Sequence, residues 1–168
     1  MHRRTRRLLL RFGFLGLAVV GVDVASGDLT QSRDHFLVVL GLDQGPSALL
    51  ELLGPNRRHL NQILFLLLDN AAKFTSDGTI EIGVEVLEDR LSCEIRDSGI
   101  GICPDDQQFI FDEFYQVDAL SSNKYRGAGL GLALVRDLLN LLDGEMSLSS
   151  DVGRGTTVTF HVPVEVVG

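Results

Sequence analysis

The sequence is poor in cysteine, with only two in 168 residues. Cys93 falls in a segment of alternating apolar and polar residues, and Cys103 falls in a loop pattern. Cysteines that bind metal usually come in closely spaced pairs, and this pair has no such spacing. We therefore expect no cysteine metal site, and we expect both thiols to be buried or incidental groups in a reducing compartment.

Basic residues are scarce outside the N-terminus. The whole chain carries 15 Lys and Arg against 23 Asp and Glu, which gives a formal net charge of -8. Five of the arginines lie within residues 3–11, so the remainder carries 10 basic against 23 acidic residues, a net charge of -13. A body of that charge repels phosphate backbones, and nucleic acid is not an expected partner.

A hydrophobic run long enough to span a bilayer is also missing. The apolar stretch from Leu8 to Val22 is interrupted by Arg11 and falls short of the roughly 20 residues that a spanning helix needs. Its basic start and the small residues beyond it have the outline of a secretory signal. An amphipathic helix, a fusion segment or the remnant of an upstream domain are the alternatives that we favour. Residues 1–35 are therefore an N-terminal segment of uncertain structure, followed by one domain over residues 36–168.

Two common nucleotide-binding signatures are absent as well. No Gly-Lys-Ser or Gly-Lys-Thr is present, and the glycine run of residues 127–132 has the wrong spacing for a dinucleotide fingerprint. A different arrangement is found instead. Asp97 ends an alternating segment and is followed by Gly99 and Gly101, which let the backbone turn sharply and approach a flat ligand. Residues 127–132 precede a helical segment whose first N–H groups could receive phosphate oxygens, so the two runs together predict a nucleotide site.

Three polar residues allow both a binding and a structural interpretation. Asp97 lies at the inner end of a predicted strand, where a carboxylate either caps a turn or accepts a hydrogen bond from an amino group of a buried base. Asn70 and Lys73 are neighbours on a predicted helix. An Asn carbonyl can ligate Mg²⁺ and a Lys can meet a phosphate, but a solvated pair at a helix end is also common.

Hydrophobic periodicity predicts the fold. A helix is predicted to start at residues 54–56, with apolar residues at helical spacing from Leu60 to Phe74. Another is predicted over Leu132 to Leu142, and a short helix from Pro104 through Phe111. Alternation predicts strands over residues 80–86, 91–96, 145–149 and 156–162, and an apolar run predicts another over residues 36–42. The polar segment 115–126 is expected to be a mobile loop. We expect an α+β fold, a two-layer α/β sandwich with a mixed, mostly antiparallel sheet and helices on one face.

From about Phe36 onward, the chain resembles the ATP-binding catalytic domain of sensor histidine kinases, in the GHKL superfamily. Residues 62–75 resemble the N box, 97–101 the first glycine box, 110–118 the F box, 127–132 the second glycine box and 153–156 the final turn. One glycine pattern alone is weak evidence, whereas five segments in the family's order are strong evidence. The resemblance implies ATP and Mg²⁺ as ligands and a mobile ATP lid over residues 116–126.

The resemblance also implies roles for individual residues. Asn70 would hold Mg²⁺ between the phosphates, and Lys73 and Lys124 would contact the phosphates, so these three are the catalytic candidates. Asp97 would accept the adenine amino group. The other residues implied at the nucleotide are Gly99, Gly101, Phe111, Phe114, Gly127, Gly129, Leu130, Gly131 and Thr156. Among them, Gly101 would give the base close backbone access, the two phenylalanines would pin the lid, the last three glycines would form its hinge and cradle, and Thr156 would reach the adenine pocket. Catalysis would rest on positioning and charge neutralisation.

Three features depart from the family's pattern. The N box usually has an asparagine where this chain has Leu66, and the gyrase and chaperone ATPases of the superfamily have a water-activating Glu there, so simple ATP hydrolysis is disfavoured. The lid has Asn123 where an Arg is common, and Arg126 where the second glycine box often begins with Gly. No phosphoacceptor box is found, since the residues after His35 lack the acidic residue, the Arg and the Pro of the family's pattern.

The function implied is transfer of the γ-phosphoryl group of ATP to a histidine on a dimerisation and phosphoacceptor domain outside this chain, which then supplies a response regulator. The need for ATP favours a cytoplasmic location, and without dimerisation helices the chain by itself is expected to be a monomer. A degenerate nucleotide-binding module for interaction or regulation, without kinase turnover, is the alternative that Leu66 and the altered lid leave open. An anti-sigma-type serine kinase shares the fold, but Lys73 in its Asn-Ala-x-Lys-Phe-Thr setting favours the histidine kinases.

Overall fold

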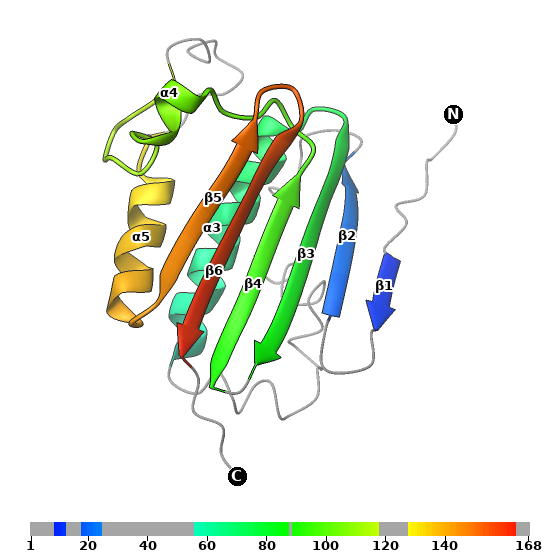
Figure 1. Cartoon of the computed structure of the whole chain (residues 1–168), viewed down its shortest axis with the longest axis vertical. Coiled ribbons are helices and arrows are strands. Elements are labelled where there is room, and N and C mark those ends of the chain that lie inside the picture. The colour runs from blue at the N-terminus through cyan, green and yellow to red at the C-terminus, as the bar shows by residue number, and fades with distance from the viewer. Residues whose placement is uncertain (1–8, 13–17, 25–55, 88, 118–127, 164–168) are drawn as a thin grey trace.

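The computed structural model describes residues 9–12, 18–24, 56–87, 89–117 and 128–163 (Figure 1). His35 and the strand predicted over residues 36–42 lie outside these ranges. So does most of the predicted lid, including Asn123, Lys124, Arg126 and Gly127. What was predicted for those residues stays a prediction.

Six strands form one sheet, in the order β1-β2-β3-β4-β6-β5. They are β1 (Leu9–Phe12), β2 (Ala18–Val24), β3 (Gly78–Leu87), β4 (Arg90–Asp97), β5 (Glu145–Asp151) and β6 (Gly155–Pro163). Every neighbouring pair is antiparallel, so the described strands include no parallel pair. The predicted α+β class with a mostly antiparallel sheet is confirmed, and the four strands predicted after residue 79 are all present.

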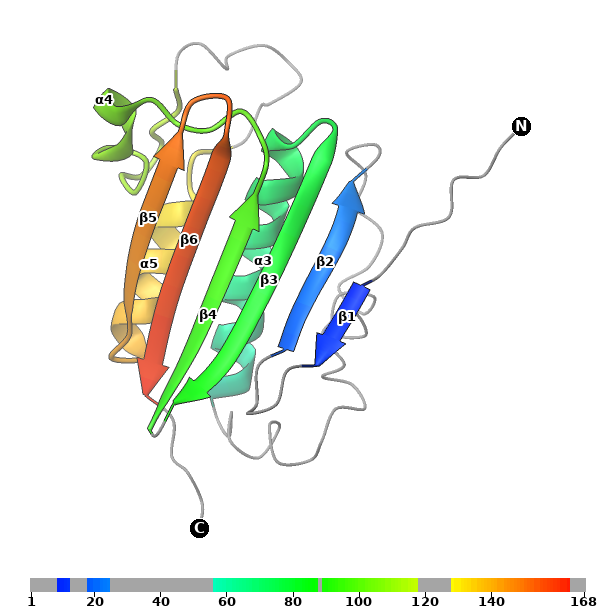
Figure 2. The same ribbon diagram turned by 45° about the vertical axis from the view of Figure 1, so that its right-hand side comes forward.

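The helices α3 (Arg57–Phe74) and α5 (Gly131–Leu141) lie on one face of the sheet, α3 behind β3 and β4 and α5 behind β5 and β6 (Figure 2). The short helix α4 (Pro104–Gln107) lies at one end. Helical spacing gives α3 an apolar stripe that is buried, made of Leu60, Ile63, Leu64, Leu67, Leu68, Ala71 and Ala72. Among the helices that the structure describes, none is long and apolar enough to cross a membrane.

The core lies between the helices and the inner face of the sheet. Alternation along β3, β4 and β6 buries Ile80, Ile82, Leu91, Cys93, Ile95, Val158, Phe160 and Val162. Phe160 is the largest of the fully buried side chains, and its burial contributes on the order of 2–3 kcal/mol. The opposite face of the sheet carries polar side chains such as Glu81, Glu94 and Arg96, and no described helix covers it (Figure 1).

Two local predictions are wrong. An amphipathic helix in the N-terminal segment is contradicted by β1 and β2. Four of the seven residues of β2 are β-branched valines, and the edge of β3 offers backbone partners to which β2 pairs from Ala18 to Val24. The helix that begins at Pro104 ends at Gln107 instead of continuing through residue 111. The apolar residues of that segment are consecutive, so they define no single helical face.

Candidate nucleotide-binding site

A cavity of about 560 Å³ opens at the end of the sheet where β4 ends, between α3, the segment that follows β4 and the start of α5. Of the residues implicated from the sequence, those that line it are Asn70, Lys73, Asp97, Gly101, Gly129, Leu130, Gly131 and Thr156. Gly99, Phe111 and Phe114 do not line it, and Lys124 and Gly127 lie outside the described residues. Segments that are far apart in the sequence thus meet at one cavity.

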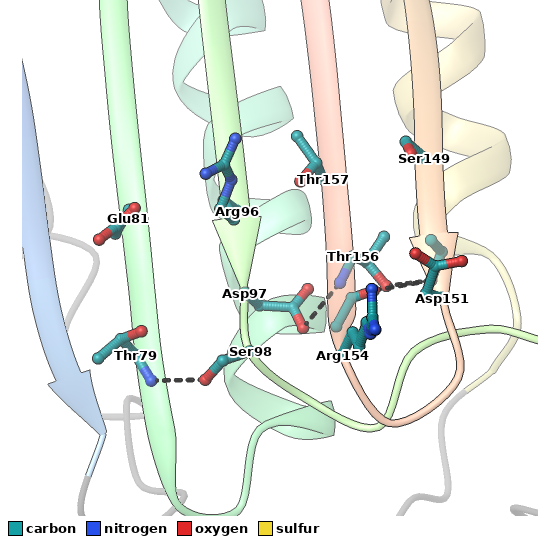
Figure 3. A pocket seen from close by; sticks show the side chains of 12 residues that line it. Thr79, Glu81, Arg96, Asp97, Ser98, Ser149, Asp151, Arg154, Thr156 and Thr157 are labelled. Carbon is teal, nitrogen blue, oxygen red and sulfur yellow. Dashed lines mark hydrogen bonds between the residues drawn. The ribbon is translucent and has the colours of Figure 1, made fainter.

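Three strand ends place polar side chains in a row on the face that the helices cover. Asp97 of β4 is the register partner of Thr156 of β6, and Thr156 is in turn the partner of Ser150 of β5. Thr156 has the parity of Val158 and Phe160, so it lies where the apolar core ends. Figure 3 shows Asp97 and Thr156 side by side on neighbouring strands. The core therefore gives way to Asp97 and Thr156 at the cavity, with Ser150 next to Thr156 on β5.

The Asp97 carboxylate is held through one of its two oxygens. Oδ1 accepts a hydrogen bond from the backbone N–H of Gly99 at 2.8 Å. It accepts another from the backbone N–H of Thr156 at 3.3 Å (Figure 3). Burial raises the pKa of Asp97, and these two hydrogen bonds offset part of that rise. Within the described part of the chain, no donor is bonded to Oδ2, so this oxygen is available to a ligand.

The two glycines after Asp97 are needed for contacts within the chain. A Cβ added to Gly99 would lie 2.5 Å from the Phe74 carbonyl oxygen and 2.8 Å from Asp97 Oδ1. Gly101 has a φ of 69°, and a Cβ there would overlap the carbonyl group of Asp151. Only glycine lets this loop pass so close to the end of α3 and to the β5–β6 turn. The close backbone approach seen at these positions is to the chain itself.

α3 brings Leu66, Asp69, Asn70 and Lys73 to the cavity. The Asn70 amide lies beside the start of α5, since a Cβ added to Gly131 would be 3.6 Å from its Nδ2 and 3.9 Å from its Oδ1. The ammonium nitrogen of Lys73 lies 5.1 Å from the centroid of the neighbouring Phe74 ring, a cation–π distance. The N-box residues and the second glycine run therefore meet at the cavity wall.

α5 begins at the cavity with backbone donors that have no intrahelical partner. Its N-cap residue, Leu130, makes no side-chain capping hydrogen bond, and its first turn has no acidic residue. The first N–H groups of a helix carry the positive end of its dipole. Gly129 has a φ of 68° and is packed so closely on the F box that its carbonyl accepts the N–H of Phe114 at 2.9 Å. This arrangement suits an anion.

The aromatic residues of the F box differ in their relation to the cavity. Phe114 is 70% exposed with a φ of 64°, and Phe111 is half-buried, and neither lines the cavity. Tyr115 lines it instead; its hydroxyl donates to Asp106 Oδ1 at 2.6 Å, and its ring lies 5.5 Å from that of Phe109. Tyr115 was not selected from the sequence. The sequence could have indicated Tyr115, because it is an amphipathic aromatic residue at the boundary between the F box and the polar loop.

Two more polar residues at the site were missed. Asp69 lines the cavity next to Asn70, and its signal was its place within the N box. Ser150 belongs to the row of strand ends, and its signal was the alternation of β5, in which Met146 and Leu148 pack on the core. The sequence alone does not assign either residue to the site. The packing of α3 places Asp69 there, and the register of the sheet places Ser150 next to Thr156.

A second hollow, of about 340 Å³, lies on the opposite, polar face at the same end of the sheet (Figure 3). It mixes both signs of charge, with Glu81, Asp97 and Asp151 beside Arg96 and Arg154. Arg96 already pairs with Glu94 at 3.4 Å. No group of like charges is present among its lining residues to select a ligand.

The residues at the cavity fit a magnesium ion that arrives with a nucleotide. In the described ranges, no three His, Cys, Asp or Glu side chains gather as a metal-binding group. Mg²⁺ bound to phosphates does not need such a group, because it takes one or two protein ligands and keeps its waters. The Asn70 carbonyl oxygen and the Asp69 carboxylate line the cavity and are ligands of the right kind.

Residues 56–166 match the family described as histidine kinase-, DNA gyrase B- and HSP90-like ATPase. The match covers more than half of the chain, and the chain therefore belongs to this family. The predicted membership of the GHKL superfamily is confirmed, and the two-layer α+β fold is the fold of this family's ATP-binding domain.

Individual relatives are sensor kinases. The autoinducer 2 sensor kinase/phosphatase LuxQ of Vibrio vulnificus (strain YJ016) is 41% identical over 112 residues, which are 63% of this chain and 13% of LuxQ. The sensor histidine kinase RcsC of Escherichia coli (strain K12) is 38% identical over 105 residues, 62% of this chain and 11% of RcsC. The chain therefore spans only a small part of the length of these curated relatives.

Solved structures share the fold. Full-length ShkA, crystallised in complex with AMPPNP, superposes with a TM-score of 0.57 and 32% sequence identity over 66% of this chain and 22% of ShkA. The mycobacterial sensor histidine kinase MprB superposes with a TM-score of 0.55 and 24% identity over 64% of this chain and 71% of that chain. The second likeness concerns the fold alone.

Proposed function

We propose that this domain binds ATP with Mg²⁺ and transfers the γ-phosphoryl group to a histidine on a separate dimerisation and phosphoacceptor domain, from which a response regulator receives it. The observation that carries the proposal is the Asp97 carboxylate, fixed through Oδ1 by two backbone donors and open at Oδ2. The same cavity reaches the first turn of α5. An acceptor for a base amino group and donors for phosphate oxygens therefore share one cavity.

The adenine lies at the sheet side of the cavity. Its amino group donates to Asp97 Oδ2, with Thr156 beside it. Aliphatic side chains that include Ile100, Leu148 and Val158 line this part and bury the flat ring. In such surroundings water is excluded, and a hydrogen bond to the charged carboxylate contributes about 1.5–3 kcal/mol.

The phosphates lie toward the helices. The first N–H groups of α5 donate to phosphate oxygens, and Lys73 reaches them by turning its flexible stem away from Phe74. Asn70 would hold Mg²⁺ through its carbonyl oxygen, and the ion would neutralise phosphate charge. Lys124 in the lid is the remaining catalytic candidate. Catalysis consists of positioning and charge stabilisation, so these residues need no covalent chemistry of their own.

Leu66 favours transfer to an outside acceptor over hydrolysis. It lines the cavity one helical turn before Asn70, and an aliphatic side chain cannot activate a water molecule. Among the described residues, three carboxylates line the cavity. Asp106 accepts the Tyr115 hydroxyl, and Asp97 is held at the base end. Asp69 is a candidate Mg²⁺ ligand. The nucleophile is therefore a histidine supplied by another domain.

The names of the relatives support a histidine kinase, since LuxQ and RcsC are sensor kinases. Because the chain covers a small part of those proteins, the phosphoacceptor domain, the response regulator, the cytoplasmic location and a monomeric isolated chain belong to the proposal. So does the division into residues 1–35 and 36–168, although β1 and β2 of the first segment extend the same sheet.

A nucleotide-binding module without turnover is the second candidate, and Leu66 at the cavity is the observation that favours it. Both candidates require ATP binding. Equilibrium titration of the purified chain and of its Asp97→Asn variant with Mg-ATP tests this step. We expect a roughly micromolar Kd that rises at least tenfold in the variant. Radiolabelled ATP with an added phosphoacceptor domain then separates the candidates, because only a kinase places label on histidine. A folded chain that binds no Mg-ATP refutes both.

A further inference from the structure

Ser150 lies at the centre of a hydrogen-bonded cluster behind the base-binding wall. Its Oγ accepts the backbone N–H of Ile102 at 2.8 Å and donates to the carbonyl oxygen of Gly155 at 3.0 Å. The same Oγ lies 2.9 Å from Oγ1 of Thr156, its register partner on β6. One half-buried hydroxyl group therefore has three partners.

The chemistry of these partners sets the direction of the bond between the two hydroxyl groups. A serine hydroxyl donates one hydrogen and accepts with two lone pairs. The Gly155 carbonyl can only accept, so it takes the hydrogen of Ser150, and the Ile102 N–H can only donate, so it takes one lone pair. The lone pair that remains can only accept. Thr156 must therefore donate its hydroxyl hydrogen to Ser150.

Two hydrogen-bond acceptors consequently lie side by side in the cavity wall. Thr156 Oγ1 has given its hydrogen to Ser150 and presents only lone pairs to the cavity that it lines. Asp97 Oδ2, on the neighbouring strand, can also only accept. At position 6, an amino purine offers an N–H donor to this wall, whereas an oxo purine, whose own ring donor lies at N1, sets a lone pair against lone pairs there.

We propose that Ser150 is a positioning residue that sets the purine selectivity of the site. By holding the Thr156 hydroxyl as an acceptor, it makes the site favour 6-amino over 6-oxo purine nucleotides. The inference rests on the proposed function, in which Asp97 and Thr156 meet the base. With alanine at position 150, the Thr156 hydroxyl hydrogen has no acceptor there and turns toward the cavity, where it donates to a 6-oxo group.

The surrounding structure does not depend on the Ser150 hydroxyl alone. The side-chain amide of Gln107 donates to the carbonyl oxygen of Ile102 at 3.0 Å and to that of Ser150 at 2.9 Å. This bridge joins the loop after β4 to the end of β5 through backbone atoms, which a substitution of the serine side chain keeps. We therefore expect Ser150→Ala to fold.

The test compares Mg-ATP with Mg-ITP, which carries a 6-oxo group in place of the 6-amino group. Dissociation constants are measured for the wild-type chain, Ser150→Ala, Ser150→Thr and the control Ser149→Ala. We expect the ratio of the ITP to the ATP constant to fall about five- to tenfold in Ser150→Ala, the factor of one neutral hydrogen bond. The threonine variant keeps the hydroxyl and the wild-type ratio. Ser149 is exposed on the opposite face of β5, so its alanine variant also keeps that ratio.

The outcomes separate the inference from the proposed function. If Ser150→Ala weakens both nucleotides by the same factor, Ser150 has a structural role only and the inference is overturned, while ATP binding by the wild type still upholds the proposed function. If the folded wild type binds neither nucleotide, the proposed function fails first. Should Ser150→Ala lose its fold in thermal unfolding, Thr156→Val replaces it. That variant removes the acceptor itself, so a lowered ratio supports the inference and an unchanged ratio overturns it.

Discussion

Gly153 lies in the turn between β5 and β6, and Gly155 begins β6. Both have positive φ, and only one of them has room for a side chain. Gly153 has a φ of 76°, and a Cβ added there would meet nothing within 4 Å. Gly155 has a φ of 102°, and a Cβ there would overlap the Asp97 carbonyl and lie 2.8 Å from the Cα of Ser98. Alanine substitutions at these two glycines therefore distinguish the cost of backbone strain alone from the cost of strain together with steric overlap.

We expect Gly153→Ala to lower the free energy of unfolding by about 1 kcal/mol, because an L-residue is strained in the left-handed region. Gly155→Ala causes a similar backbone strain and also displaces β6 from β4. We therefore expect it to lower the free energy of unfolding by about 3–4 kcal/mol in total. That displacement also lengthens the hydrogen bond from Thr156 N–H to Asp97 Oδ1, which is already 3.3 Å. Mg-ATP affinity should therefore fall at least tenfold in Gly155→Ala and stay unchanged in Gly153→Ala.

Urea denaturation measures the two free energies, and titration with Mg-ATP measures the two affinities. Equal destabilisation by both substitutions would refute the reasoning from overlap. Full affinity in a destabilised Gly155→Ala would show that the base-binding wall does not depend on the pairing of β4 with β6.

Three further predictions concern Leu66, Asp97 and the cysteines. Leu66→Asn should raise Mg²⁺-dependent ATP affinity, because it puts a polar group on the cavity face of α3; a Mg²⁺-dependent affinity equal to that of the wild type would mean that position 66 does not face the metal. Asp97→Asn should stabilise the free protein relative to the wild type as the pH rises above about 4, the ordinary pKa of an Asp. Burial raises the pKa of Asp97 in the folded state, so the wild type loses stability as the pH rises through that pKa; unfolding curves with a constant difference across the range would contradict this. A thiol reagent should label the exposed Cys103, which lines the cavity, and Mg-ATP should slow that labelling. Cys93 should react only in denaturant, since burial raises the pKa of its thiol, and rapid labelling of both thiols would contradict the packing of β4.

The strands after residue 79 could be predicted because each packs one face on the core and leaves the other more exposed. The alternation of Val158, Phe160 and Val162 with threonines and a histidine is visible in the sequence and is the alternation of burial in β6. β1 and β2 could not be predicted in the same way. An apolar stretch with a basic start suits a helix or a strand equally, and pairing with the edge of β3, a partner distant in sequence, decides between them.

The candidate site divides along a similar line. Residue types and spacing indicated Asp97 and the glycine boxes, but not what each glycine is for. Gly99 and Gly101 make room for Phe74 and Asp151, which are close only in the folded chain. The part played by Ser150 depends on the registers of β5 with β6 and of β6 with β4, and register is a property of the assembled sheet.

The two ends of the cavity belong to different layers of the fold. Asp97 and Thr156 come from the sheet, whereas Asn70 and the first turn of α5 come from the helices. A nucleotide bound at both ends would span the apolar interface between the sheet and the helices, and it would resist sliding of one layer over the other. Adenosine would reach only the sheet, and triphosphate alone would reach only the helices. The mechanical stiffness of the domain would then report whether an intact nucleotide is bound.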